Sequence, residues 1–170
     1  MSSPKPTGQL LSSDQGFDLR LVRELPAPVE RAWEWLTDPE LTEHWYGPWS
    51  GWAAEGHPID VTLAFEEGAP TVQMVIRACR EPEHLRLVSE DEYGNWDLEL
   101  SLRQHEEGSE LTFVMHQVDP QGVGEIGPGW EYYLDQLVAA INGDPRPSWE
   151  DYYPAQQAYF QDQAPDSAEH

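Results

Sequence analysis

The chain has 170 residues, and its 9 basic against 32 acidic residues give a formal net charge of −23. That length suits one domain whose core needs no covalent staples. So acidic a surface repels phosphate backbones and anionic lipid headgroups, which argues against nucleic-acid binding and membrane insertion. The charge is most simply a solubility feature. An acidic face for a basic partner, or adaptation to salt, is the alternative.

The single cysteine, Cys79, excludes an intrachain disulfide. It ends an apolar run, and no helix N-terminus with a basic neighbour lies there to lower its pKa, so a structural thiol is favoured over a reactive one. Residues 1–15 are rich in Pro, Ser, Gly and Thr and lack the apolar core of a signal peptide. We therefore expect a flexible tail over residues 1–15 and a cytoplasmic location.

The first predicted elements are a strand and two short helices. Apolar and charged residues alternate from Phe17 to Leu25, which indicates a half-buried strand that Pro26-Ala27-Pro28 ends. Apolar residues at helical spacing predict a helix over residues 29–36. Asp38 followed by Pro39 predicts the cap and first turn of a second, shorter helix.

An aromatic loop over residues 45–52 precedes a series of strands. Period-two alternation predicts six strands in all, joined by short turns and therefore antiparallel, with one apolar face. Ala78 is expected to continue the inward face that Met74 and Ile76 begin. The six stretches are residues 17–25, 59–65, 72–78, 85–87, 96–103 and 111–115.

A long helix is predicted to cover the apolar face. Residues 129–141 carry apolar side chains at spacings of three and four, and Asn142-Gly143 supplies the C-cap. The glycines of residues 122–129 are interpreted as a loop and a helix start. The domain then spans residues 16–161, and residues 162–170 are expected to be disordered. Aromatic residues near the C-terminus predict a segment that packs back: Trp149, Tyr152, Tyr153, Tyr159 and Phe160.

Several phrases in this order resemble a known family. They are Ala-Pro-x-Glu-x-x-Trp at residues 27–33, Thr-Asp-Pro-Glu at 37–40, Trp-Tyr-Gly-Pro at 45–48 and the aromatic stretch 129–137. Over roughly residues 17–143 the chain is similar to the heat-shock-chaperone ATPase activator homologues of the START-like (SRPBCC) superfamily. The resemblance implies an α+β helix-grip (Bet v-like) fold, in which a curved antiparallel sheet wraps round a C-terminal helix and an apolar cavity. It does not imply an activity.

The candidate ligand site is the inside of that cavity. Aromatic side chains at inward positions indicate either an apolar pocket or ordinary core packing. Arg23 and Gln117 share the inward parity of their strands, so they either orient a polar ligand group or reach solvent or a structural carboxylate. The candidate residues are Trp45, Trp49, Trp52, Phe65, Met74, Trp96, Phe113, Met115, Gln117, Trp130, Tyr133 and Arg23.

No catalytic motif is recognisable. The histidines lack zinc spacing, no Gly-x-Ser-x-Gly elbow occurs, and the glycine-rich stretches do not sit in a βαβ unit. Strand carboxylates take the outward parity, which leaves Glu55 and Glu125, in loops, as the acids free to point inward. We predict no catalytic residue, no metal and no cofactor.

We therefore predict a protein that binds a small apolar or aromatic ligand in an internal cavity, as a monomer or homodimer. One alternative is a cofactor-free cyclase, hydratase or hydrolase, which would need Arg23, His57 or Gln117 inside the pocket. The other is a chaperone ATPase activator. Because the tail is short, we expect the additional N-terminal domain of the eukaryotic activators to be missing. Attraction through outer acids such as Asp97 and Glu99 would be weak and salt-sensitive.

Overall fold

The computed structural model describes residues 4–14, 16–52, 54–66, 68–91 and 94–164. Its helices are α1 (Val29–Thr37), α2 (Pro39–Thr42), α3 (Val123–Asn142) and α4 (Gln157–Gln161), with a 3-10 turn at Trp149–Asp151. The strands are β1 (Gln9–Ser13), β2 (Gly16–Leu25), β3 (Trp49–Gly51), β4 (Pro58–Thr62), β5 (Thr71–Arg80), β6 (His84–Asp91), β7 (Gly94–His105) and β8 (Gly108–Met115). None of the helices described is long and apolar enough to cross a bilayer.

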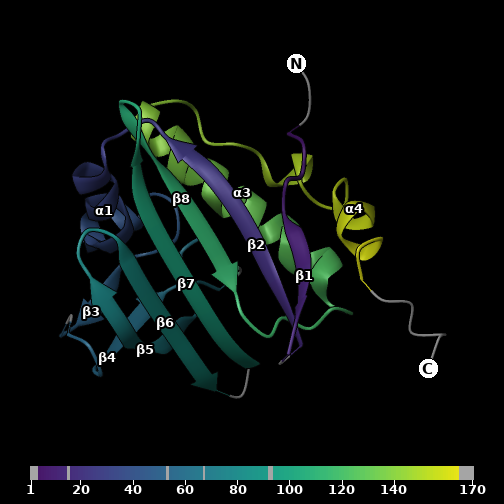
Figure 1. Cartoon of the computed structure of the whole chain (residues 1–170), viewed down its shortest axis with the longest axis horizontal. Helices are drawn as coiled ribbons and strands as arrows, with labels where there is room; N and C mark the ends of the chain where they lie inside the picture. The colour runs from purple at the N-terminus through teal and green to yellow at the C-terminus, as the bar shows by residue number, and fades with distance from the viewer. Residues whose placement is uncertain (1–3, 15, 53, 67, 92–93, 165–170) are drawn as a thin grey trace.

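The strands form one antiparallel sheet in the order β1-β2-β8-β7-β6-β5-β4-β3 (Figure 1). All six predicted strands are present, and their pairing follows from the short turns that join them. The return of β8 to pair with β2 brings the first predicted strand beside the last. The sheet has two further strands, one at each edge: β1, and β3 inside the aromatic loop.

The expectation of a flexible tail over residues 1–15 is wrong for β1. This strand pairs with β2 from Gln9 opposite Arg20 to Ser13 opposite Gly16. It is an edge strand with mostly exposed side chains, so backbone hydrogen bonds hold it and its polar composition gives no sign of order. Similarly, Gln163 accepts a hydrogen bond from the Leu10 amide at 2.9 Å, although disorder was expected there. Residues 165–170, the rest of that prediction, lie outside the described residues.

Helix α3 lies along β2 and β8 behind the sheet (Figure 1). It begins at Val123, earlier than predicted, and continues through Pro128. Two of the glycines interpreted as a loop, Gly124 and Gly127, are instead places where α4 approaches: a Cβ on Gly127 would lie 2.5 Å from the Phe160 ring. The predicted C-cap is confirmed, because Gly143 adopts a left-handed φ of 75°.

The C-terminal segment packs beside α3 at the β1 edge of the sheet (Figure 1). Phe160 and Tyr152 are fully or almost fully buried, which confirms that this aromatic segment returns to the domain. Trp149 and Tyr159 are each 39% exposed and cover its outer surface. Helix α3 is thus enclosed from two sides, whereas α1 and α2 cover another part of the sheet.

Candidate ligand-binding site

The corner between α1 and α2 builds one wall of the site. Helix α1 turns its apolar stripe inward and buries Trp33 and Leu36. The predicted cap at the corner is confirmed, since the Asp38 carboxylate accepts a hydrogen bond from the Glu40 amide at 2.9 Å. The backbone direction therefore changes sharply at Asp38, and the aromatic loop that follows lies against α1.

Two tryptophans tie this loop to α1 through their ring nitrogens. Trp45 Nε1 donates to the Trp35 carbonyl at 2.8 Å, and Trp49 Nε1 donates to the Thr37 carbonyl at 2.9 Å. Because both indole N–H groups have protein acceptors, the two rings can offer apolar surface without an unsatisfied donor.

Between this corner and the sheet lies a cavity of about 520 Å³. Its walls are aliphatic on the sheet side and aromatic around the loop and α3. The main buried sheet residues of the lining are Ile59, Val61, Ile76, Leu85, Leu98 and Leu100. The aromatic residues of the lining are Trp33, Trp45, Tyr46, Trp49, Phe113 and Trp130.

Trp130 of α3 is the centre of the aromatic cluster beneath the cavity. Its ring centroid lies 4.3 Å from that of Phe113 and 5.8 Å from that of Tyr46, which is stacked on it. Trp96 and Tyr133 approach the same ring at 6.2 and 5.6 Å. These contacts fix the ring by packing on several sides, so this end of the cavity is a rigid aromatic surface.

The exposed residues of the lining mark the mouth of the cavity. Glu34 and Asp38 belong to the α1 side, whereas Cys79 lies near the end of β5 and Glu81 directly follows that strand. Cys79 was expected to be structural, but it is an exposed free thiol. Partial burial, followed by the nearby charges of Glu81 and Glu55, raises the pKa of this thiol, which disfavours the reactive thiolate.

A β-bulge explains why Cys79 rather than Ala78 faces the cavity. Ile76 pairs with Leu87, but the register shifts at the next step so that Ala78 pairs with Arg86 and Cys79 with Leu85. One extra residue inverts the faces of the strand that follows it. The predicted inward position of Ala78 is therefore wrong.

Four of the predicted site residues line the cavity: Trp45, Trp49, Phe113 and Trp130. Met74, Met115, Trp96 and Tyr133 lie in or against the surrounding core. The Tyr133 hydroxyl donates to Glu66 at 2.5 Å, and burial together with this contact raises its pKa well above the ordinary value. These four residues support the walls from behind.

Trp52, Phe65 and Gln117 do not line the cavity. Trp52 is 70% exposed and lies against His57 with ring centroids 4.3 Å apart. Phe65 is half-buried beneath the Arg146 guanidinium, 4.5 Å from its ring. Gln117 is exposed, and its backbone N–H donates to the Asp18 carboxylate at 3.1 Å. Each comes just after a strand has ended, where the alternation no longer fixes the direction of a side chain.

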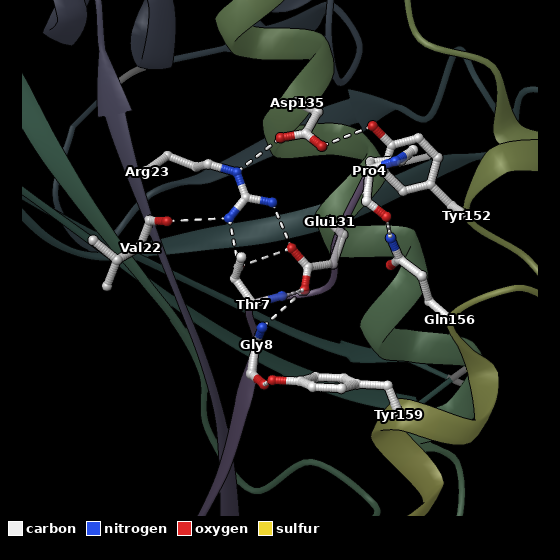
Figure 2. A network of polar contacts seen from close by, with 10 residues as sticks. All are labelled: Pro4, Thr7, Gly8, Val22, Arg23, Glu131, Asp135, Tyr152, Gln156 and Tyr159. Carbon is white, nitrogen blue, oxygen red and sulfur yellow. Dashed lines mark hydrogen bonds and ion pairs between the residues drawn. The ribbon is translucent and has the colours of Figure 1, made fainter. Parts of the chain in front are cut away.

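Arg23 does face inward, but it meets α3 instead of the cavity (Figure 2). Its guanidinium binds Glu131 at 2.5 Å and Asp135 at 2.8 Å. Burial alone would lower the arginine pKa, but the two carboxylates outweigh this and raise it. The structural carboxylate considered from the sequence is thus the partner of Arg23.

Both ends of the chain join this ion pair. Glu131, whose side chain is 1% exposed, also accepts hydrogen bonds from the amides of Thr7 and Gly8 at 2.5 and 2.8 Å. From the C-terminal segment, the Tyr152 hydroxyl donates to Asp135 at 2.7 Å (Figure 2). We call residues 4–8 and 152–163, packed around Glu131 and Asp135, the terminal clamp.

Glu55 and Glu125, the acids left free by the sequence, are both exposed. Within the described part of the chain, no group of three or more His, Cys, Asp or Glu residues is arranged to hold a metal ion. On the outer face of the sheet, Glu99 accepts hydrogen bonds from His84 at 2.6 Å and His116 at 2.7 Å.

Sequence reasoning missed much of the lining, including Trp33, Tyr46, Ile59 and Val61. The sequence shows that these residues are apolar and face inward. Alternation distinguishes the two faces of a strand or helix, but it does not distinguish a residue in the packed core from one that lines a cavity. The quoted family phrases contain Trp33 and Tyr46, and this was the signal that could have identified them.

Comparisons with known proteins agree on the fold. The crystal structure of CalU16 from Micromonospora echinospora matches with a TM-score of 0.75 and 22% identity, over 95% of this chain and 98% of that chain. The solution structure of the BPP1335 gene product from Bordetella parapertussis gives 0.69 and 20%, over 96% and 94%. DynU16, described as a protein of the dynemicin biosynthetic locus, gives 0.66 and 20%, over 84% of this chain and 51% of that chain.

No curated protein matches the sequence significantly. The sequence model of one family, described as "Activator of Hsp90 ATPase homolog 1-like protein", matches residues 26–142, which is more than half of the chain. With the open antiparallel sheet and the long helix α3, this confirms the helix-grip fold expected from the sequence. The chain belongs to the family of Activator of Hsp90 ATPase homolog 1-like proteins.

Proposed function

We propose that the protein binds a small apolar or aromatic molecule in the cavity between the sheet, α1 and α3. The observation that carries this proposal is the cavity itself, about 520 Å³ of space walled by aliphatic and aromatic side chains. Binding sites for small organic molecules fall in the range of about 300–1,000 Å³ and are mostly apolar. Planar ligands suit this site best, because Trp130 and its neighbours present several ring surfaces.

One structural neighbour comes from a biosynthetic locus. DynU16, which shares the fold, is described by its place in the dynemicin biosynthetic locus. At 20% identity this likeness establishes the fold alone, and the ligand of this chain is therefore inferred from its own cavity.

The lining supports binding rather than acid–base catalysis. Arg23, His57 and Gln117, which an enzyme was expected to place inside, are absent from it. The Tyr46 hydroxyl is buried without a hydrogen-bond partner among the described residues. Burial, and then the charge of Glu66, raises its pKa, so the phenol stays protonated and cannot act as a base.

The outer acids considered for a chaperone contact are already paired. Asp97 accepts two hydrogen bonds from Arg86, at 2.8 and 2.7 Å, and Glu99 is held by two histidines. Such pairing reduces the charge that a basic partner would meet. Ligand binding is thus the better-supported proposal, and failure to stimulate a chaperone's ATPase stays a prediction.

The proposal is tested by titrating the protein with the neutral fluorophore N-phenyl-1-naphthylamine and following both probe and tryptophan emission. We expect saturable binding and an increase in Tm. Val61→Phe combined with Leu87→Phe fills the lining and should abolish binding, while Trp52→Ala, outside the cavity, should leave it intact. Binding that survives the filled variant would place the probe elsewhere and refute the proposal.

A further inference from the structure

We infer that the cavity takes ligands that are uncharged or positively charged and rejects carboxylates such as fatty acids. This inference rests on the proposed ligand binding and adds the chemical class of the ligand. It follows from the distribution of charged groups along the path from solvent to Trp130.

All charged residues of the lining are acidic. Glu34, Asp38 and Glu81 are exposed at the mouth, and no Lys, Arg or His lines the cavity among the described residues. The acids come from both sides of the mouth, since two belong to the α1–α2 corner and one follows β5. A ligand must therefore pass between negative charges, which repel an anion and attract a cation.

Nearby bases cancel only part of this charge. Arg31 pairs with Glu34 and offsets part of its charge, but both side chains are about half exposed, so the pair is weak. Arg80, next to Glu81 in the chain, lies 3.5 Å from Glu83 instead. Among the described residues, the Asp38 carboxylate accepts a hydrogen bond only from the backbone N–H of Glu40, and this contact leaves its charge in place.

The interior offers an anion no partner either. Behind the mouth the lining is aliphatic and aromatic, and the buried Arg23 is held by Glu131 and Asp135 on another side of α3. A carboxylate moved inward would lose its water without gaining a counterion. An aromatic amine can instead bury its rings and leave its ammonium group at the acidic mouth.

Three naphthalene compounds of similar size separate charge from shape: 2-naphthalenemethanol, 2-naphthylmethylamine and 2-naphthoate. Dissociation constants for the wild-type protein are measured by tryptophan fluorescence and calorimetry at pH 7 and low salt. We expect the alcohol and the amine to bind, the amine at least as tightly, and the carboxylate to bind at least about tenfold more weakly than the alcohol. Added salt should reduce the advantage of the amine.

Glu34→Gln combined with Glu81→Gln should raise the ratio of carboxylate to alcohol affinity at least about threefold. Glu106→Gln combined with Glu107→Gln is the matched control, because it makes the same formal charge change in the exposed β7–β8 turn. It should leave the ratio unchanged.

The outcomes separate this inference from the proposal on which it rests. If the alcohol and the carboxylate bind equally well, or if the mouth and control variants change the ratio equally, the charge selection is wrong and the ligand site stands. If none of the three compounds nor N-phenyl-1-naphthylamine binds, both are wrong.

Discussion

On one side of α3, Trp130 and Tyr133 face a hollow and its aromatic supports, while on the other side Glu131 and Asp135 are packed within the terminal clamp. Neighbouring residues of one helix thus enter opposite environments. The cavity side is apolar and leaves space, whereas the clamp side is polar and filled. We interpret the terminal clamp as the contact that fixes the position of α3. The cavity side of the helix therefore does not need to pack tightly against the sheet to keep the helix in place.

The strongest way to break this arrangement is Arg23→Ala. It leaves Glu131, which is 1% exposed, without its charged partner, and loss of one member of a buried ion pair costs about 3–5 kcal/mol. Urea unfolding measures the loss. Arg103→Ala is the control: it removes a 63% exposed arginine from its pair with Glu110, and the loss should be much smaller because solvent screens that pair. Equal losses for the two variants would contradict the comparison.

Gly127→Ala tests how tightly the clamp side is filled. The new methyl group would meet the Phe160 ring at 2.5 Å, and overpacking of this kind costs about 1–3 kcal/mol. Gly129→Ala, two residues along the same helix, has no atom within 4 Å of the added carbon and should stabilise the protein by up to about 1 kcal/mol. Thermal unfolding of both variants should give Tm changes of opposite sign.

Leu87→Phe adds volume on the cavity side instead. The larger ring can extend into the hollow, so we expect the free energy of unfolding to change by less than about 1 kcal/mol while ligand affinity falls. Leu134→Phe, at a fully buried position of α3, is the matched change in a packed environment and should cost about 1–3 kcal/mol. Similar costs at both positions would show that the cavity side is as filled as the rest.

The smallest effect is expected on the outer face of the sheet, remote from both sides of α3. Burial would raise the pKa of Glu99, but hydrogen bonds from His84 and His116 outweigh it and hold the pKa below the ordinary 4.5. A lowered folded-state pKa contributes stability that is present above the unfolded value and is lost as pH falls through the folded value. The stability advantage of wild type over Glu99→Gln should therefore shrink below about pH 4.5, by at most about 1 kcal/mol. Urea unfolding midpoints of wild type and Glu99→Gln, measured from roughly pH 6 to pH 3, test this expectation. A constant difference between the two midpoints over that range would contradict it.

The fold was predictable because alternation, turns and family phrases all agree on it. The period-two patterns predicted six strands, and all six are present. Asn142-Gly143 predicted the end of α3. The glycines at the start of α3 led to the wrong prediction of a loop, and the reason is physical. Gly127 looks like a helix breaker, but its use is to admit Phe160, a contact between residues 33 positions apart that local propensity cannot show.

The site was less predictable because facing inward and lining a hollow are different properties. Met74 and Trp130 both face inward, yet only Trp130 borders empty space. Arg23 had the expected parity, but its partners are on a helix more than 100 residues away. The bulge before Ala78 turns Cys79 toward the cavity. The alternation of apolar and polar residues in β5 gives no sign of this bulge.

The terminal clamp also constrains the order in which the molecule can be completed. Gln163 contacts Leu10 across 153 positions of the chain, and Glu131 contacts Gly8 across 123. During synthesis the chain emerges from its N-terminus, so β1 can pair with β2 early, but Leu10 must wait for residue 163 to leave the ribosome. All residues that line the cavity have been translated once Trp130 is made, whereas the terminal clamp can close only after residue 163 has been made.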